Sequence, residues 1–155
     1  MKKVIKHYTE SIHYDIEQTA KIIKLVAAQL FNKLNFDIVP EEYSALDVIS
    51  CHSGICQRDL AKLIFKDRAN TGRILNSLET KGLITRFVDT KNNRLVRKMA
   101  MTEAGYKKLN EINLKFEKAL LDNREGIFSE DDVENLQISL RKFRVSLEKL
   151  LELKI

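Results

Sequence analysis

The sequence predicts a mainly α-helical protein that contains one small β-hairpin. Apolar residues near both ends of the 155-residue chain recur at alternating steps of three and four, the spacing of amphipathic helices that pack along a seam. Between these ends lie two short helical patterns joined by only a few residues. Two extended runs follow them, the first rich in β-branched and aromatic residues, and a polar turn separates the two.

The N-terminal third is predicted to form two helices. The first covers residues 9–34 and carries one apolar stripe, made by Ile12, Ile16, Thr19, Ile23, Val26 and Leu30. The second begins at Pro40, because proline fits the first turn of a helix and lacks only an amide that would be unbonded there. Glu41 and Glu42 follow, where the positive end of the helix dipole favours carboxylates. Gly54 is expected to stop this helix.

Two short helices are predicted next, over about residues 57–65 and 68–81. Asp67 is the expected N-cap of the second helix, and Gly82 closes it. Its inward face is formed by Ile74, Leu75 and Leu78. Because so few residues join the two helices, they form a helix-turn-helix arrangement.

A hairpin is predicted directly after this pair of helices. Residues 83–88 form the first expected strand, residues 89–94 the turn, and residues 95–101 the second strand. A helix-turn-helix followed by such a hairpin, or wing, is a winged helix-turn-helix, which we place at about residues 38–101.

Further helices are predicted over about residues 103–153, and Ser129 is a strong N-cap for the last of them. One amphipathic stripe would indicate ordinary core packing. Two such stripes at opposite ends of a single domain, residues 1–155, are better explained by one helical interface between two copies of the chain. Residues 9–34 and 103–153 are therefore predicted as dimerisation helices. The predicted dimer interface consists of Ile12, Ile16, Ile23, Val133, Leu136, Leu140, Phe143, Leu147 and Leu150.

The net charge of +5 is concentrated in one segment of the chain. Residues 66–98 hold nine Lys/Arg and three Asp/Glu, whereas residues 1–65 are neutral and residues 99–155 carry a charge of −1. A near-neutral body with one basic segment is typical of a protein that binds a polyanion. On charge alone, the alternative is a basic face that is merely solvated.

Several other classes of protein are not supported by the sequence. No apolar run approaches the ~18 residues that a membrane span needs, so we expect a soluble, cytoplasmic protein. Cys51 and Cys56 are too few for a disulfide framework, and with three histidines they form no repeated metal-ligand pattern. His52 beside Cys51 could ligate a metal in a dimer, but we interpret it as a helix-end histidine. Because no Gly-rich phosphate loop, nucleophile elbow or HExxH motif is present, we expect neither an enzyme nor a cofactor.

Three blocks of the sequence together resemble the MarR family. They are residues 57–63 (QRDLAKL), residues 71–86 (TGRILNSLETKGLITR) and residues 101–105 (MTEAG). The pattern LExxGLIxR alone is shared by other winged helices, but all three blocks in this order, between two amphipathic ends, are more specific. The resemblance covers the order of elements along nearly the whole chain.

This resemblance implies an obligate homodimer with recognition helices in successive major grooves of double-stranded DNA and wings in the minor groove. It also implies a transcriptional regulator, usually a repressor, that releases DNA when a small molecule binds or a cysteine is oxidised. Because a symmetric dimer presents two reading heads about one DNA turn apart, we expect the operator to be an inverted repeat. The wing departs from the family's common Asp-x-Arg, because it reads Asn92-Asn93-Arg94, and we expect a looser wing. Gly72 lies inside the recognition helix at a cost of roughly 1 kcal/mol relative to Ala. It either allows close approach to DNA or, as we favour, is a tolerated weakness.

Candidate DNA contacts lie on the recognition helix and the wing. A recognition helix reads base edges from its N-terminal half, and Arg suits guanine whereas Asn suits adenine. We expect these contacts from Arg68, Asn70, Thr71 and Arg73. Arg94 is the candidate for the minor groove. The further candidates for wing and phosphate contacts are Lys91, Asn92, Asn93, Arg97, Lys98, Ser53, Arg58 and Lys62.

One hypothesis concerns oxidation, and two alternatives concern the function as a whole. Cys56 falls where a helix should start, and a helix N-terminus raises the thiolate fraction of a cysteine. Cys51 is near enough in sequence to capture a sulfenate, although two unreactive, half-buried thiols remain the alternative. The alternatives to DNA binding are a winged-helix module for protein–protein interaction and a helical scaffold protein.

Overall fold

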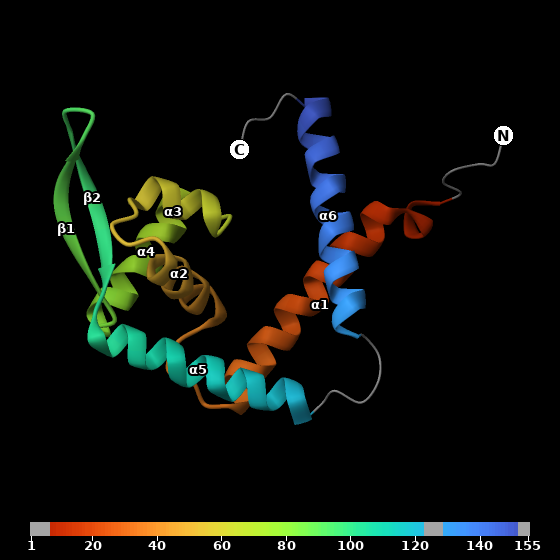
Figure 1. Ribbon diagram of the computed structural model, residues 1–155, viewed down its shortest axis with the longest axis horizontal. Coiled ribbons are helices and arrows are strands. Elements are labelled where there is room, and N and C mark those ends of the chain that lie inside the picture. The colour runs from red at the N-terminus through yellow and green to blue at the C-terminus, as the bar shows by residue number, and fades with distance from the viewer. Residues whose placement is uncertain (1–6, 123–128, 152–155) are drawn as a thin grey trace. The chain divides into compact units, whose positions relative to one another are not determined.

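The structure is a computed structural model that describes residues 7–122 and 129–151. Contacts divide the chain into two units, Met1–Ile112 and Asn113–Ile155, each described by itself below. The predicted fold class, mainly helical with one hairpin, is confirmed (Figure 1). The prediction of one domain over the whole chain stays a prediction. Residues 123–128 and 152–153 of the predicted C-terminal helices lie outside the described residues.

Most of the elements belong to the first unit (Figure 1). A short 3-10 helix precedes four α-helices, an antiparallel hairpin and the beginning of α5. The bounds are η1 Tyr8–Glu10, α1 Ile12–Lys33, α2 Pro40–Cys51, α3 Gln57–Leu63, α4 Arg68–Thr80, β1 Ile84–Lys91, β2 Arg94–Met101 and α5 Glu103–Asp122. The end of α5 and the helix α6, Glu130–Leu151, belong to the second unit.

The first long helix begins later than the sequence predicts. Ser11 is extended, with φ −93° and ψ 147°, and its Oγ accepts a hydrogen bond from the Tyr14 N–H at 3.1 Å. This N-cap starts α1 at Ile12 rather than at residue 9, and the residues before it form the separate η1 turn. Ile12 and Ile23 of the predicted stripe are exposed and Ile16 is half-buried, so this side of α1 is not covered within its unit.

The core of the first unit lies where α2, α3, α4, the hairpin and the start of α5 meet. Each of these elements contributes apolar side chains that are fully or almost fully buried. Since burying one large apolar side chain stabilises a fold by about 1.5–3 kcal/mol, this packing holds the helix-turn-helix together. The largest of these side chains are Leu46, Ile49, Leu60, Leu75, Leu78, Ile84, Met99 and Ile112.

Both ends of α4 are marked by local signals that the sequence shows. At the start, Asp67 Oδ1 accepts the Asn70 N–H at 2.8 Å, as expected for an N-cap. At the end, Gly82 has a φ of +70°, and the N–H groups of Gly82 and Leu83 return to carbonyls of the last turn at 2.9 Å each. This is the Schellman arrangement, and it directs the chain out of the helix and into β1.

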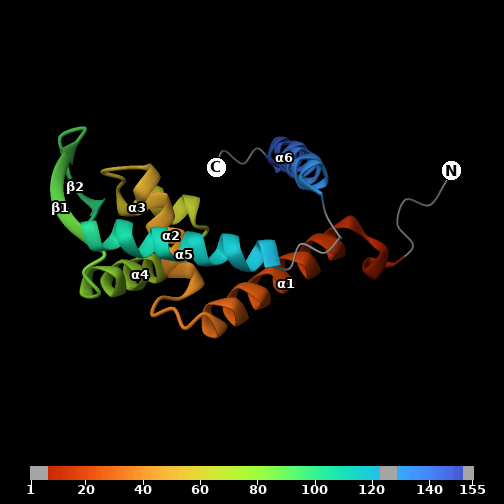
Figure 2. The same cartoon turned by 60° about the horizontal axis from the view of Figure 1, so that its bottom comes forward.

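The hairpin is tighter than the sequence predicts. β1 and β2 pair up to Lys91 opposite Arg94, so the turn consists of Asn92 and Asn93 alone. Their φ values, +52° and +58°, are both positive, as a type I′ turn requires, and asparagine tolerates this conformation better than most residues. The predicted turn over residues 89–94 is therefore wrong, whereas the looseness of the wing stays a prediction. Figure 2 shows the hairpin as a narrow twisted ribbon that extends alongside α3.

In the second unit, α6 begins at the predicted cap. Ser129 Oγ accepts the Asp132 N–H at 3.1 Å, and Asp132 Oδ2 accepts the Ser129 N–H at 2.9 Å. The apolar stripe of α6 is exposed, from 38% at Phe143 to 79% at Leu150. Among the described helices, none combines the length and the hydropathy that crossing a membrane would require.

Candidate nucleic-acid interface

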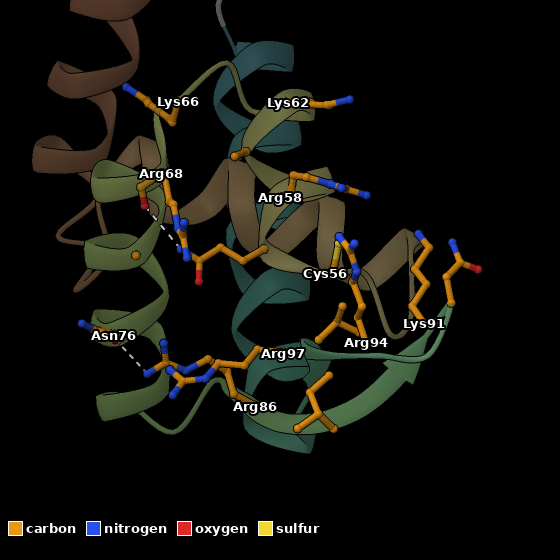
Figure 3. Close-up of a pocket in the computed structure, with 16 residues that line it drawn as sticks. Cys56, Arg58, Lys62, Lys66, Arg68, Asn76, Arg86, Lys91, Arg94 and Arg97 are labelled. Atoms are coloured by element: carbon orange, nitrogen blue, oxygen red, sulfur yellow. Dashed lines mark hydrogen bonds between the residues drawn. The ribbon is translucent and has the colours of Figure 1, made fainter.

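A basic groove lies between α3, α4 and the hairpin (Figure 3). Its volume is about 1400 Å³, and its described lining holds eight Lys or Arg side chains but no Asp or Glu. The lining cations give this concave surface a positive potential that attracts an anion, although four of the eight also pair with carboxylates outside the lining. The eight side chains are Arg58, Lys62, Lys66, Arg68, Arg86, Lys91, Arg94 and Arg97.

Arg86 fixes the hairpin to α4 and forms one wall of the basic groove. Its Nε donates to Glu79 Oε2 at 2.9 Å, and its Nη2 donates to Asn76 Oδ1 at 2.7 Å (Figure 3). The hydrogen bonds from this guanidinium hold the pKa of Glu79 below its usual value. Arg86 and Lys66 line the groove although neither is among the DNA contacts predicted from the sequence, and Arg86 belongs to the family-like block.

A second set of contacts fixes the hairpin to α3. Lys91 Nζ on β1 lies 3.3 Å from Asp59 Oδ2 on α3, and the same carboxylate accepts a hydrogen bond from the Cys56 thiol at 3.1 Å. The bond from Cys56, followed by that from Lys91, lowers the pKa of Asp59. The backbone of Met99 also exchanges hydrogen bonds with residues 54 and 55, at 3.1 and 3.0 Å. Both walls of the groove are therefore held in place by the fold.

The N-terminal half of α4 carries predicted base contacts on its solvent side. Arg68 and Arg73 are exposed, and Asn70 is half-buried. Arg73 Nη2 donates to Asn70 Oδ1, and Asn70 Nδ2 donates to Asp67 Oδ2. Arg68 lines the basic groove, whereas Asn70 and Arg73 lie outside its lining.

Thr71 is buried, contrary to the prediction from the sequence. It is predicted to contact bases, but it is 0% exposed and its Oγ1 donates to the Asp67 carbonyl at 2.8 Å. Thr71 lies four positions before the buried Leu75, so the helix period places both on the core side. The hydroxyl finds its partner inside the helix, and Thr71 has no surface with which to contact DNA.

The predicted wing residues fall into two groups. Lys91, Arg94 and Arg97 line the basic groove together with Asn92, whereas Asn93 is exposed at the turn outside this lining. A smaller hollow of about 520 Å³ at the base of the wing is lined instead by Ser53 and Lys98, among other residues. Lys98 Nζ is bound to Asp89 Oδ2 at 2.6 Å. The structure thus does not bring Ser53 and Lys98 to the basic groove.

The two cysteines occupy different environments, and both are free thiols. Cys56 is the N-cap residue of α3, at the predicted helix start, and is 8% exposed. Cys51 is exposed at the end of α2. Sensing of oxidants by these thiols stays a prediction.

The helix-turn-helix and the hairpin match a known protein family. Residues 38–96 match the sequence model of the MarR family, and these residues contain the helix-turn-helix and most of the hairpin. This segment of the chain, residues 38–96, is thus a MarR-family domain. The predicted family, the predicted winged helix-turn-helix and the predicted class, a DNA-binding transcriptional regulator, are therefore confirmed. MarR-family regulators are not enzymes, which agrees with the prediction for this chain.

Solved structures extend the likeness beyond the matched segment. The chain is similar to S. aureus MepR in a DNA complex, with 25% identity, 91% of this chain and 99% of that chain covered, and a TM-score of 0.67. SlyA has the same fold at 24% identity, with 92% and 97% covered and a TM-score of 0.70. BpsR of Bordetella bronchiseptica has it at 15% identity, with 90% and 97% covered and a TM-score of 0.74. Comparison with curated proteins gives no match.

Proposed function

We propose that this MarR-family protein binds an inverted-repeat operator as a homodimer and represses the genes that follow it. The observation that carries the proposal is the basic groove, which is lined by eight Lys and Arg side chains from the helix-turn-helix and the hairpin. Neutralising DNA phosphates with Lys and Arg releases condensed counterions, and this release supplies much of the affinity for DNA. The structure of the similar MepR is a complex with DNA, which supports DNA as the partner here.

The recognition helix and the wing have different tasks in this proposal. The exposed N-terminal half of α4 enters the major groove, where Arg73 donates to a guanine and Arg68 contacts a base or a phosphate. Arg94, next to the tight turn, enters the minor groove. Because Arg86 ties the hairpin to α4, the distance between the two reading elements is set before DNA binds.

The dimer is supported by the apolar stripes of α1 and α6. In the described chain the side chains of the α6 stripe are between 38% and 79% exposed, and Ile12 and Ile23 of α1 are 58% and 62% exposed. Large apolar surface of this kind is typical of an interface rather than of a monomer. A twofold dimer presents two recognition helices about one DNA turn apart, and its operator is then an inverted repeat.

Release of the operator by a small molecule or an oxidant is also part of the proposal, because it is typical of the family. Cys56 supports the oxidant route, since its thiol contacts Asp59, the carboxylate that holds Lys91 of the wing. Hydrogen peroxide would convert this thiol to a sulfenic acid and release water. If peroxide oxidises both Cys51 and Cys56 and DNA affinity does not change, the oxidant route is excluded.

The experiment that tests the proposed function is a binding titration across a salt series. Wild-type protein, Lys62→Ala and Lys107→Ala are compared on a random duplex and on a duplex selected by the wild type from a randomised pool. Both lysines are exposed on helices, but only Lys62 lines the basic groove, so Lys107→Ala is a matched control. We expect Lys62→Ala to reduce the salt slope by about 1 on both duplexes, and the control to leave it unchanged.

The same titration can contradict the proposal. A wild type that binds neither duplex at low salt would refute DNA binding. A salt-independent interaction with another protein would then favour a winged-helix module for protein–protein contact.

A further inference from the structure

Three polar side chains form a continuous chain across the first turn of α4. Asp67 Oδ2 accepts a hydrogen bond from Asn70 Nδ2, and Asn70 Oδ1 accepts one from Arg73 Nη2. The three residues follow each other at steps of three, so one helical face carries them all.

Asp67, the first of these three side chains, makes further hydrogen bonds within α4. Its Oδ1 caps the helix by accepting the Asn70 N–H at 2.8 Å, and its carbonyl accepts the buried Thr71 hydroxyl at 2.8 Å. The backbone and side-chain hydrogen bonds from Asn70 lower the pKa of Asp67, and the charge of Arg73 adds to them. Asp67 therefore stays an ionised acceptor at neutral pH.

Each end of the Asn70 amide makes one hydrogen bond within the protein. An asparagine that reads adenine uses its amide oxygen and its amide nitrogen together, against N6 and N7 of the base. In this structure the oxygen already accepts from Arg73 and the nitrogen already donates to Asp67. If Asn70 read a base, its amide would have to share both ends with these bonds or turn away from Asp67 and Arg73.

We propose that Asn70 is a positioning residue, which holds the Arg73 guanidinium in place for a base and does not itself read the DNA sequence. This inference rests on the proposed DNA binding and deepens it. An arginine on a surface loses rotamer freedom when it binds, and a guanidinium that is already held loses less. Arg73 uses Nη2 toward Asn70, and its other N–H groups remain available for guanine O6 and N7.

The test is a double-mutant cycle on the duplex that the wild type selects from a randomised pool. Asn70→Ala is expected to weaken binding by about 2- to 12-fold, the factor that corresponds to ordering one flexible side chain. In the Arg73→Ala background the same substitution is expected to have almost no further effect, because Asn70 then has nothing to position. Repeating the selection with each single variant should show relaxed preference at the same base position of each half-site.

Asp67→Ser is a second variant, which we expect to raise the affinity for random duplex and to lower the preference for the selected duplex. Serine keeps an N-cap acceptor for α4 but removes the second oxygen, which holds the Asn70 amide. Removing a negative charge from a DNA-facing helix should strengthen binding to random duplex. The ratio of selected to random affinity should nevertheless fall, because Arg73 is held less firmly. A purely structural role of Asp67 would lower both affinities together.

Several outcomes would overturn the role of Asn70. One is relaxed preference at a base position different from that of Arg73→Ala, and another is an undiminished effect in the Arg73→Ala background. Thermal unfolding of each variant shows that the helix is intact. A wild type that binds no duplex overturns the proposed function together with this role, whereas DNA binding that Asn70→Ala leaves unchanged overturns the role alone.

Discussion

Two glycines of the family-like blocks differ in what an added methyl group would meet. A Cβ on Gly105, in the first turn of α5, would lie 2.1 Å from the Leu83 carbonyl oxygen and 3.1 Å from its carbon. That oxygen also accepts the Thr102 N–H at 3.1 Å. A Cβ on Gly72, inside α4, would meet only the Gln57 Nε2 at 3.5 Å, an ordinary van der Waals contact.

These distances predict opposite effects of the same substitution on the free energy of unfolding. In a helix, alanine is favoured over glycine by about 1 kcal/mol, and nothing opposes this gain at position 72. At position 105 the overlap is with backbone, which cannot rotate away, so overpacking costs about 1–3 kcal/mol. Weakening the bond from Thr102 costs about 1 kcal/mol more. Gly72→Ala should therefore stabilise the protein by about 1 kcal/mol. At position 105 the helix gain and the weakened Thr102 bond offset each other, so Gly105→Ala should destabilise the protein by about 1–3 kcal/mol.

Urea unfolding at one fixed protein concentration measures both effects, because the stability of a dimer depends on concentration. Each kcal/mol should also shift Tm by about 2–4 °C for a chain of this size. A Gly105→Ala variant as stable as wild type would refute the packing argument. DNA titration of Gly72→Ala then decides the two interpretations of that glycine: unchanged affinity means a tolerated weakness, and lost affinity means that the helix needs close approach.

Four further predictions address assembly, recognition and pH. Leu140→Glu places a charge in the proposed dimer interface, so sedimentation of this variant should show monomer or unfolded chain. A wild type that is a folded monomer at micromolar concentration would contradict the interface. Arg73→Ala should cost about 1–3 kcal/mol on the selected duplex and relax one base position per half-site. Arg94→Ala should weaken binding to the selected and the random duplex more evenly and reduce the salt slope. If Arg94→Ala abolishes sequence preference and Arg73→Ala does not, the assignment of α4 as the recognition helix is wrong. Burial opposes ionisation of Glu42, but hydrogen bonds, led by that from Lys81 at 2.7 Å, hold its pKa below the ordinary value of 4.5. Its stabilising contribution is therefore present above that pH and lost as the pH falls through the lower folded-state pKa, and Glu42→Gln should reduce this acid sensitivity in unfolding measured against pH.

The sequence by itself determined the features that depend on neighbours along the chain. The starts of α2 at Pro40 and of α4 after Asp67, and the stop at Gly82, follow from bonds within one helical turn. The same local chemistry was available for the turn Asn92-Asn93, but its two positive φ values become visible only when the strands pair up to Lys91.

The tertiary structure decided which residues share a surface. Thr71 belongs to the core face because α4 packs through that side, although its hydroxyl suggested a solvent position. Lys91 meets Asp59 from 32 residues away, and Arg86 reaches back to α4 from the hairpin. The clash predicted at Gly105 likewise comes from Leu83, on a separate segment. Such contacts depend on how distant segments pack against a common core, and the periodicity of any one segment does not contain that information.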